Sequence, residues 1–323
     1  MEYMGNQKTV SVAVVTYNSS KTVLETLESI KQQKYANIEL IISDDASVDD
    51  TISVCKEWLT ENGQRFVRFN LLTVEKNTGV PANSNRAIKE CKGSWLKLIA
   101  GDDILLETCI ADFVEYMTLH PEVKVTFSRC RPFKIVNGEK RFLQEIPSTD
   151  QKRYYTLSTD LQRICHYYWQ LPFPGPVVFF KKDLFDTYSF NEKYDGLEDY
   201  PFYMQLLEDG IHIDFMDKVT VLWRRGESLS SSKKYMKNPR LQRSKDMYFL
   251  DHQYNYLKEN YPEIFKYRMA QHFIANFMIT FLRNRPTLFN RIILKGVHLW
   301  LRKEEHYNLD EVINKYSKKV AIE

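Results

Sequence analysis

Apolar residues in the first hundred positions follow two alternating periods. Short runs rich in β-branched residues, typical of buried parallel strands, alternate with stretches whose apolar residues recur at helical spacing. Strands are expected at Val10–Val15, Ile38–Ser43, Val67–Val74 and Trp95–Ala100. The intervening helices are expected to carry Val23, Leu24, Leu27 and Ile30 on one face, to cover Ile52–Leu59, and to include Ala87–Cys91.

This alternation predicts an α/β fold. Strand and helix in turn, joined by short connections, give a mostly parallel central sheet flanked by helices, with right-handed crossovers. In sheets of this kind, ligands bind beyond the carboxyl ends of the strands. Chemistry is therefore expected in the residues that directly follow each strand.

The pattern loosens after about Pro121. The sequence predicts a strand, a loop or hairpin, a helix and a second strand, at Val123–Ser128, Arg131–Arg153, Leu157–Trp169 and Val177–Phe180 respectively. From about Lys233 onward, helix follows helix. The polar stretch GESLSSSKK predicts a soft boundary, which gives a catalytic domain over residues 1–230 and a helical C-terminal region over residues 231–323.

Polar clusters stand where strands or loops end. Each cluster alone has a simpler interpretation, because Asp and Ser are common helix N-caps. Three clusters at the carboxyl edge of one parallel sheet favour a binding site. The clusters are Thr16, Tyr17 and Asn18; Asp44 and Asp45; Asp102 and Asp103; and a fourth, Glu198 and Asp199, which is expected to open a helix.

The pair Asp102 and Asp103 predicts a metal site. Two adjacent carboxylates repel each other unless a cation lies with them. Oxygen ligands of this kind suit Mg²⁺ or Mn²⁺, which are commonly shared with substrate phosphates. Neither GxGxxG nor GxxxxGK[ST] occurs in the sequence, which argues against dehydrogenases and P-loop NTPases.

Composition narrows the class of protein. Charged residues make up 27% of the chain but the formal net charge is only +3, which argues against a dedicated nucleic-acid binder. The five cysteines are widely spaced and form no CxxC pair, so neither a disulfide framework nor a zinc site is expected. The protein is instead expected in a reducing cytoplasm. The first residues are polar and no run of 18 apolar residues occurs, so the chain is expected to be soluble or peripheral to a membrane.

Several segments resemble a family 2 glycosyltransferase. VSVAVVTYNSS, IELIISDDASVDDT and EKNTGVPANSNRAIKECKGSWLKLIAGDDIL match the opening of that family in order and spacing over residues 8–128. GPVVFFKKDLFDTYSFNEKYDGLEDYPFYMQLLEDG resembles its acceptor-side segment, and WRRGESLS resembles the segment that closes over the diphosphate. The resemblance covers about residues 8–230.

The resemblance implies a Rossmann-like GT-A fold, a nucleotide-diphospho-sugar donor (by family habit a UDP-sugar), Mn²⁺ or Mg²⁺, and inversion at the anomeric carbon. It also implies roles for individual residues. Thr16, Tyr17 and Asp44, with Asn18 beside them, would hold the base and ribose, supported by Asp45; Asn77 and Gly79 would lie beside the nucleobase; Asp102 and Asp103 would bind the metal, with Asp103 the direct ligand; Arg224 would belong to the closing segment; and Asp199, next to Glu198, would be the general base.

These roles meet the needs of sugar transfer. An acceptor hydroxyl is a poor nucleophile at neutral pH, so a positioned carboxylate takes its proton as the new bond forms. The transition state resembles an oxocarbenium ion. One base suffices, because the leaving diphosphate is stabilised by the metal.

The sequence departs from the family pattern at three points. Ala100 replaces the first Asp of the acidic motif, Gly226 replaces a His of the closing segment, and Arg86 follows Asn85 where an Arg often precedes that Asn. The departures leave open a decayed, non-catalytic sugar-binding or scaffold protein, and a nucleotidyltransferase is the rival among enzymes. Retention of Asp102, Asp103 and Asp199 argues against a decayed protein. The resemblance implies a glycosyltransferase of surface polysaccharide or glycan biosynthesis, with a glycan or lipid-linked saccharide as acceptor.

The segment 281–303 allows two interpretations. It holds six basic residues and no acidic one, with Arg291, Lys295, His298 and Arg302 on one helical side and Leu288, Phe289, Ile292, Ile293 and Trp300 over much of the rest. Such a helix could lie on an anionic membrane at its cytoplasmic face. Alternatively, its apolar side packs on the catalytic domain and its basic side is solvated.

Overall fold

The computed structural model describes residues 8–168, 175–194, 196–226, 238–304 and 309–320. These residues pack into two compact units. The first comprises residues 8–155, 175–192 and 211–225, and the second comprises residues 156–168, 193–194, 196–210 and the described residues from 226 onward. The chain passes between the units more than once, and the predicted division at residue 230 stays a prediction.

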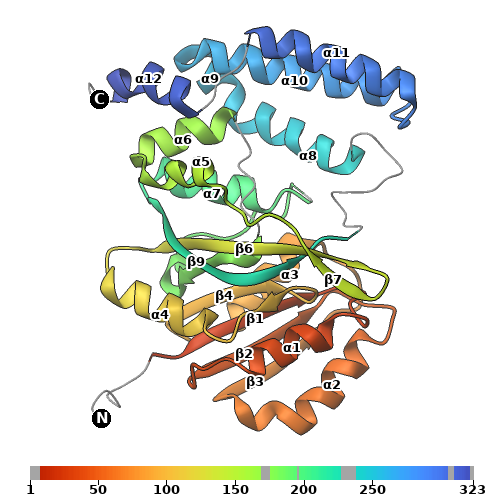
Figure 1. Ribbon diagram of the computed structural model, residues 1–323, viewed down its shortest axis with the longest axis vertical. Helices are drawn as coiled ribbons and strands as arrows, with labels where there is room; N and C mark the ends of the chain where they lie inside the picture. The colour runs from red at the N-terminus through yellow and green to blue at the C-terminus, as the bar shows by residue number, and fades with distance from the viewer. Residues whose placement is uncertain (1–7, 169–174, 195, 227–237, 305–308, 321–323) are drawn as a thin grey trace. The chain divides into compact units, whose positions relative to one another are not determined.

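The first unit is built on one sheet (Figure 1). Strands β3, β2, β1 and β4 are parallel to one another, whereas β8 is antiparallel to both of its neighbours, β4 and β6. The sheet order is β3-β2-β1-β4-β8-β6-β9-β5, with β7 paired to β6 outside this path. The predicted α/β fold is therefore confirmed. In the described residues the strands are β1 Val10–Thr16, β2 Ile38–Asp44, β3 Arg68–Thr73, β4 Trp95–Ala100, β5 Ile104–Leu105, β6 Val125–Val136, β7 Glu139–Phe142, β8 Val178–Lys181 and β9 Ile213–Arg224.

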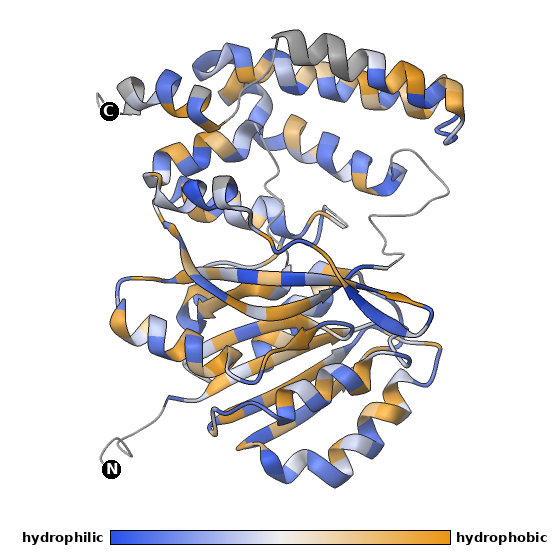
Figure 2. Cartoon of the chain, in the orientation of Figure 1, coloured by the Kyte–Doolittle hydropathy of each residue, from blue (hydrophilic) through white to orange (hydrophobic). Residues whose placement is uncertain are grey.

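The register of the parallel strands brings their carboxyl ends level. Thr16 at the end of β1 lies opposite Asp44 of β2, and Val15 lies opposite Ala100 of β4. Strands β1 and β2 are buried almost throughout, as their apolar runs predict, and Figure 2 shows these runs as hydrophobic bands through the sheet. The polar residues that follow β1, β2 and β4 therefore share one edge of the sheet.

Helices flank this sheet. Helix α3 packs on β1 and β2, α4 packs on β9, and α1 packs on α2. The chain up to residue 186 forms helices α1 Val23–Lys31, α2 Thr51–Asn62, α3 Val80–Glu90, α4 Cys109–Leu119, α5 Thr149–Lys152 and α6 Thr159–Tyr168, with 3-10 turns η1 Gly63–Arg65, η2 Arg153–Thr156, η3 Gly175–Val177 and η4 Lys182–Asp186. Of these, α6 belongs to the second unit.

One predicted helix face was partly wrong. Val23, Leu27 and Ile30 of α1 are fully buried, but Leu24 is 46% exposed. Successive residues of an α-helix are about 100° apart, so a stripe through Val23, Leu27 and Ile30 turns Leu24 toward solvent. Thr26 and Ser29 fill the rest of the buried face.

Two substantial elements lay outside the predictions. Residues 109–119 form α4 and residues 213–224 form β9. Strand β9 pairs with β6 on one side and β5 on the other, with a register irregularity opposite Ser128 to Cys130. Asp214, Asp217 and Lys218 interrupt its apolar residues, so the sequence shows neither a continuous apolar run nor a regular alternation of apolar and polar residues.

The second unit is helical, which confirms the run of helices expected after Lys233 for the residues described there. No helix among the described residues has the length and apolar character needed to cross a membrane. Besides α6, this unit contains α7 Asp199–Glu208, α8 Pro239–Tyr248, the π-helical turn η5 Phe249–Gln253, α9 Tyr254–Asn260, α10 Pro262–Thr280, α11 Leu288–Glu304 and α12 Leu309–Val320.

The five cysteines are all buried, free thiols. Burial raises the pKa of Cys55 to about 12 and that of Cys109 to about 11. Cys165 in α6 is equally enclosed, with a pKa raised by burial to about 12. The side chains therefore act as small apolar groups of the core.

Candidate active site

The loops after β1 and β2 are tied together by Asp44. Its buried carboxylate accepts hydrogen bonds from Thr16 Oγ1 at 2.7 Å, Ser47 N at 2.8 Å and Ser47 Oγ at 2.6 Å. Asn18 adopts a left-handed conformation with φ 52°; its N–H donates to Ser47 Oγ and its Oδ1 accepts from Val48 N. Thr16, Asn18 and Asp44 thus meet as predicted.

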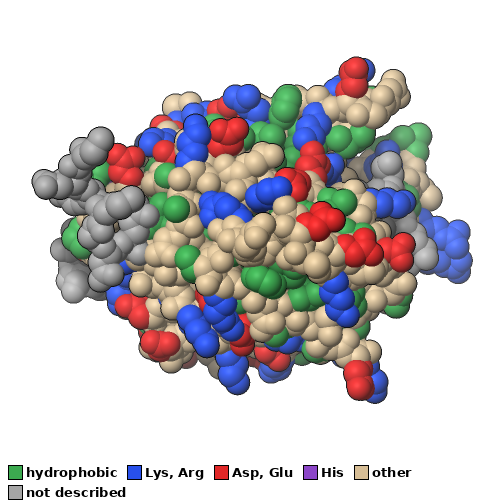
Figure 3. Space-filling view, turned by 90° about the horizontal axis from the view of Figure 1, so that it is seen from below, with side chains coloured by type: hydrophobic (Ala, Val, Ile, Leu, Met, Phe, Trp, Pro, Cys, Tyr) green, Lys and Arg blue, Asp and Glu red, His purple; other side chains and the backbone are tan. Residues whose placement is uncertain are grey.

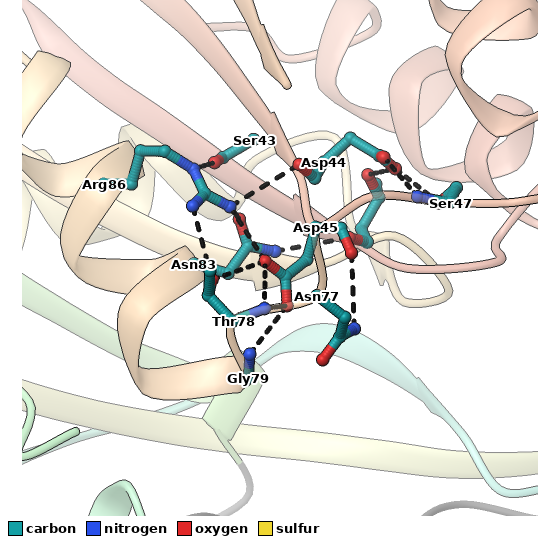
Figure 4. Close-up of polar contacts among 10 residues, drawn as sticks. Ser43, Asp44, Asp45, Ser47, Asn77, Thr78, Gly79, Asn83 and Arg86 are labelled. Atoms are coloured by element: carbon teal, nitrogen blue, oxygen red, sulfur yellow. Dashed lines mark hydrogen bonds and ion pairs between the residues drawn. The ribbon is translucent and has the colours of Figure 1, made fainter. Parts of the chain in front are cut away.

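The neighbouring Asp45 holds a different loop (Figure 4). Its carboxylate accepts hydrogen bonds from Thr78 N, Thr78 Oγ1 and Gly79 N, at distances of 2.6–3.1 Å. The Asn77 amide donates to the Asp45 carbonyl at 3.3 Å. Burial raises the pKa of Asp45, but the hydrogen bonds from Thr78, Arg86 and Gly79 outweigh it and the net shift is downward. The predicted residues Asn77 and Gly79 are therefore fixed through Asp45.

Arg86 is a site residue that sequence reasoning missed. Its guanidinium donates to Ser43 Oγ at 3.0 Å, Asp45 Oδ1 at 3.1 Å and Asn83 Oδ1 at 2.8 Å (Figure 4). Asn83 in turn donates to the Thr16 carbonyl at 3.2 Å. The spacing of Asn83 and Arg86, three residues apart on one helix, was the available signal.

Replacing Asp45 by Asn is expected to destabilise the first unit. The amide presents an N–H group where Thr78 and Gly79 present N–H donors, and an unsatisfied buried group costs about 1–3 kcal/mol. Because the pKa of Asp45 is lowered in the folded state, its stabilisation is present above the ordinary Asp pKa and is lost as pH falls through the folded value. Urea unfolding should show a deficit at pH 7 that narrows at lower pH.

Asp50→Asn is the matched control, because Asp50 is exposed and its side chain makes no capping hydrogen bond to α2. If the two variants unfold at the same urea concentration at pH 7, the Asp45 contacts do not stabilise this loop.

The acid pair after β4 is locked beside Thr16. Gly101 donates its N–H to the Val15 carbonyl at 2.9 Å, and Thr22 Oγ1 donates to the Gly101 carbonyl at 2.8 Å. A Cβ atom at Gly101 would lie 2.7 Å from Thr16 Cγ2, so only glycine allows this close approach. The segment that carries Asp102 and Asp103 therefore starts beside Thr16, which is hydrogen-bonded to Asp44.

Asp103 is 2% exposed and Asp102 is half-buried. Asp103 Oδ1 accepts from Arg224 N at 2.8 Å. Burial raises the pKa of both carboxyls, and the charge of Asp102 raises that of Asp103 further. Two adjacent, poorly solvated carboxylates favour a cation, so this donor set fits a divalent metal. Within the described residues no three His, Cys, Asp or Glu side chains cluster as metal ligands, so other oxygens would complete the coordination.

Arg224 lies at the end of β9, against the acid pair. Its Nε donates to the Asp102 carbonyl at 2.8 Å, and its guanidinium pairs with Glu25 and lies 4.8 Å from the Phe133 ring centroid. Tyr17, by contrast, is 47% exposed. Asn18 and Asn77 are exposed as well, so three of the predicted nucleotide residues in the first unit are open to solvent.

Glu198 and Asp199 belong to the second unit, where they open α7 as predicted. Glu198 is the N-cap residue and Asp199 the first helical residue. Burial, and next the charge of Glu198, raise the pKa of Asp199 well above its usual range. A raised pKa makes the ionised Asp199 carboxylate a stronger base.

The face of the molecule seen in Figure 3 carries acidic and basic side chains interspersed, without an extended patch of one sign. This distribution agrees with the near-balanced composition of the chain.

Comparison with known proteins gives consistent matches. Residues 11–186 match the family model for glycosyl transferase family 2. UDP-Gal:alpha-D-GlcNAc-diphosphoundecaprenol beta-1,3-galactosyltransferase of Escherichia coli is 25% identical over 291 residues, which span 89% of this chain and 95% of that protein. Glycosyltransferase GlyG of Streptococcus pneumoniae is 33% identical over 101 residues, 31% of this chain and 32% of that protein.

Two solved structures share the fold. S. aureus TarS 1–349 in complex with UDP-GlcNAc matches with a TM-score of 0.57 at 19% identity, over 88% of this chain and 77% of that one. Mannosyltransferase PcManGT of Pyrobaculum calidifontis, in complex with GDP-Man and Mn²⁺, matches with a TM-score of 0.55 at 17% identity, over 98% of this chain and 87% of that one. The structural likeness establishes the GT-A fold, and the family model spans more than half of the sequence. This chain belongs to glycosyl transferase family 2.

Proposed function

We propose that this glycosyltransferase moves a sugar from a UDP-sugar to a hydroxyl group of a lipid-linked saccharide, with inversion at the anomeric carbon, in surface polysaccharide synthesis. The observation that carries the proposal is the shared sheet edge, where the Asp44 and Asp45 network meets the Asp102 and Asp103 pair. The E. coli relative, whose name specifies a UDP-Gal donor and a diphosphoundecaprenol-linked acceptor, supports this choice of substrates.

In this proposal the first unit binds the donor. Asp44, Thr16 and Tyr17 hold the base and ribose, while Asp45 and Arg86 keep the loop of Asn77 and Gly79 in place beside the base. Asp102 and Asp103 would hold Mn²⁺ or Mg²⁺, which neutralises charge on the departing diphosphate when bound. The Mn²⁺ in the PcManGT complex supports a divalent ion.

Asp199 is the proposed general base. The acceptor oxygen forms its bond to the anomeric carbon as the bond from that carbon to the diphosphate oxygen breaks, and the hydroxyl proton passes to the Asp199 carboxylate. A single displacement of this kind inverts the anomeric configuration. The diphosphate leaves as an anion, so no second carboxyl group is needed to protonate it.

Donor binding tests this function directly. UDP and a UDP-sugar should raise the melting temperature in the presence of Mn²⁺, since a ligand at a hundredfold its Kd stabilises by about 2.7 kcal/mol. GDP and ADP, at equal concentration, are the controls for base preference. A shift without any release of UDP from UDP-sugars would favour the decayed, sugar-binding alternative, and an absence of both would contradict the proposed function.

We also propose contact with an anionic membrane through the α10–α11 hairpin. The hairpin carries five apolar side chains that are between 61% and 76% exposed, and the rings of Phe277 and Phe281 stack with their centroids 5.3 Å apart. The alternative interpretation of this segment, in which its apolar side is packed and buried, does not hold for Leu288, Phe289 and Ile292, which are exposed. The side chains of His298, Trp300, Arg302 and Lys303 lie outside the described residues. We refer to these five exposed apolar side chains as the crest: Phe273, Phe281, Leu288, Phe289 and Ile292.

Charge selects an anionic membrane as the partner. Exposed basic side chains at Arg283, Arg285, Arg291 and Lys295 border the crest. The sequence has no acidic residue between Glu263 and Glu304. Basic residues around an inserting apolar surface suit anionic headgroups, whereas a second copy of the chain would bring like charges together.

Flotation with phosphatidylglycerol vesicles should recover the protein at low salt, with less recovered on phosphatidylcholine or at high salt. Changing Phe281, Leu288 and Phe289 together to Ser should lower binding well over tenfold, because burial of each of these side chains contributes about 1.5–3 kcal/mol. Val48, Val67 and Leu119, changed together to Ser, are the control because they are exposed on the first unit. Equal binding by both variants, or no flotation of the unaltered protein, would rule out this surface.

A further inference from the structure

A π-helical turn lies beside the proposed base in the second unit. Turn η5, residues Phe249–Gln253, joins α8 to α9 without a break in the helical path. Such turns are rare and occur frequently at functional sites. Three consecutive residues of this turn bond to the residues on either side of Glu198 and Asp199: Asp251, His252 and Gln253.

The first anchor precedes the acidic pair. Tyr194 is fully buried, and its hydroxyl donates to Asp251 Oδ2 at 2.9 Å and lies 2.8 Å from His252 Nε2. Because the hydroxyl has only one proton to donate, His252 Nε2 must carry the proton of the second bond. Lys193 Nζ, at 2.7 Å, holds the same Asp251 oxygen. The backbone is thus fixed four residues before Glu198.

The second anchor follows the acidic pair. Gln253, 1% exposed, donates its amide N–H to the Tyr200 hydroxyl at 2.9 Å. The Tyr200 ring stacks on His166 with centroids 4.7 Å apart and meets Tyr248 edge-on at 5.5 Å. Tyr200 directly follows Asp199, so its position sets the path of the first turn of α7.

We propose that η5 is a clamp that positions the Asp199 carboxylate for proton transfer, with Tyr194 and Gln253 as positioning residues. In an α-helix, three consecutive side chains spread over about 200°, because each is turned by about 100° from the last. The additional residue in each π turn narrows this spread. One short turn therefore reaches both sides of the acidic pair. The inference rests on the proposed role of Asp199.

The clamp is tested with Tyr194→Phe, which removes one hydroxyl, and Gln253→Met, which removes the amide at similar length. Misplacing a reacting group by about 1 Å can lower the rate on the order of a hundredfold. Each variant should lower kcat tenfold or more, with the KM for the UDP-sugar changed less than twofold and the protein folded at the assay temperature. Tyr254→Phe is the control, because its ring packs edge-on against Phe265 at 5.0 Å, away from residues 193–200.

A kcat equal to that of the control would overturn the clamp, and so would a parallel loss of kcat, donor affinity and melting temperature. Gln253→Glu, which keeps the Oε1 acceptor that lies 3.4 Å from the Tyr200 hydroxyl, should restore part of the rate lost in Gln253→Met. Asp199→Asn, assayed alongside, separates the two ideas: if that variant turns over normally, the proposed base is wrong, whatever the clamp variants do.

Discussion

Asp199→Asn is expected to lower the rate of sugar transfer by about a hundredfold to ten-thousandfold, the range attributed to a general base. Donor binding should be nearly unchanged, because Asp199 is proposed to act on the acceptor hydroxyl, whereas other residues are proposed to hold the nucleotide. Steady-state transfer to a lipid-linked GlcNAc acceptor gives the rate, and calorimetry with UDP and Mn²⁺ gives the donor affinity.

The same substitution should stabilise the protein at neutral pH. The folded-state pKa of Asp199 is raised by burial and by Glu198, so the folded chain holds the proton more tightly than the unfolded chain. Stability therefore falls as pH rises from the ordinary Asp pKa through the raised value. The Asn variant lacks this loss, so its melting temperature should exceed that of the unaltered protein at pH 7 and approach it near pH 4.

Asp209→Asn, an exposed residue at the other end of α7, is the control for both measurements. Near-normal turnover in Asp199→Asn would place the base elsewhere. A lower melting temperature would mean that the carboxylate is better stabilised than its surroundings indicate.

Asp103→Asn is expected to remove the metal-dependent part of UDP binding, with a loss on the order of a hundredfold in affinity. An amide oxygen can still accept the hydrogen bond from Arg224 N, so the fold should survive. Calorimetry with UDP, with and without Mn²⁺, separates the two contributions.

Asp112→Asn serves as the control, because Asp112 pairs with Lys218 on the surface and contacts neither the acid pair nor Arg224. Unchanged Mn²⁺-dependent affinity in Asp103→Asn would exclude this carboxylate as a ligand. Affinity lost equally with and without Mn²⁺ would mean that Asp103 acts only through the local structure of the loop.

The sheet edge was predictable because apolar, β-branched runs stop abruptly at polar residues. Thr16, Asp44 and Asp102 follow such runs, and parallel strands bring their carboxyl ends together. The hydrogen bonds of Asp45 to Thr78 and Gly79 were not predictable. They depend on the path of the loop after β2, where Ala46 takes φ 63°, a conformation that nothing in its side chain indicates.

Long-range pairing explains the other differences. Arg86 joins the site only because α3 packs on β1 and β2, which brings its guanidinium to Ser43 and Asp45. Strand β9 is stabilised by partners on both sides, which offset its charged residues. The hydrogen bonds of the π turn to Tyr194 and Tyr200 join residues more than fifty positions apart, so no local sequence pattern indicates them.

The buried cysteines make this chain convenient for site-directed labelling. With thiol pKa values near 11–12, less than about one part in ten thousand is thiolate at neutral pH, so alkylating reagents should spare the native protein. A dye or spin label attached to a newly introduced surface cysteine would then report from that position alone, without removal of the natural thiols. Because Cys55 lies in the first unit and Cys165 in the second, their reactivity during denaturation would also distinguish the opening of one unit from that of the other.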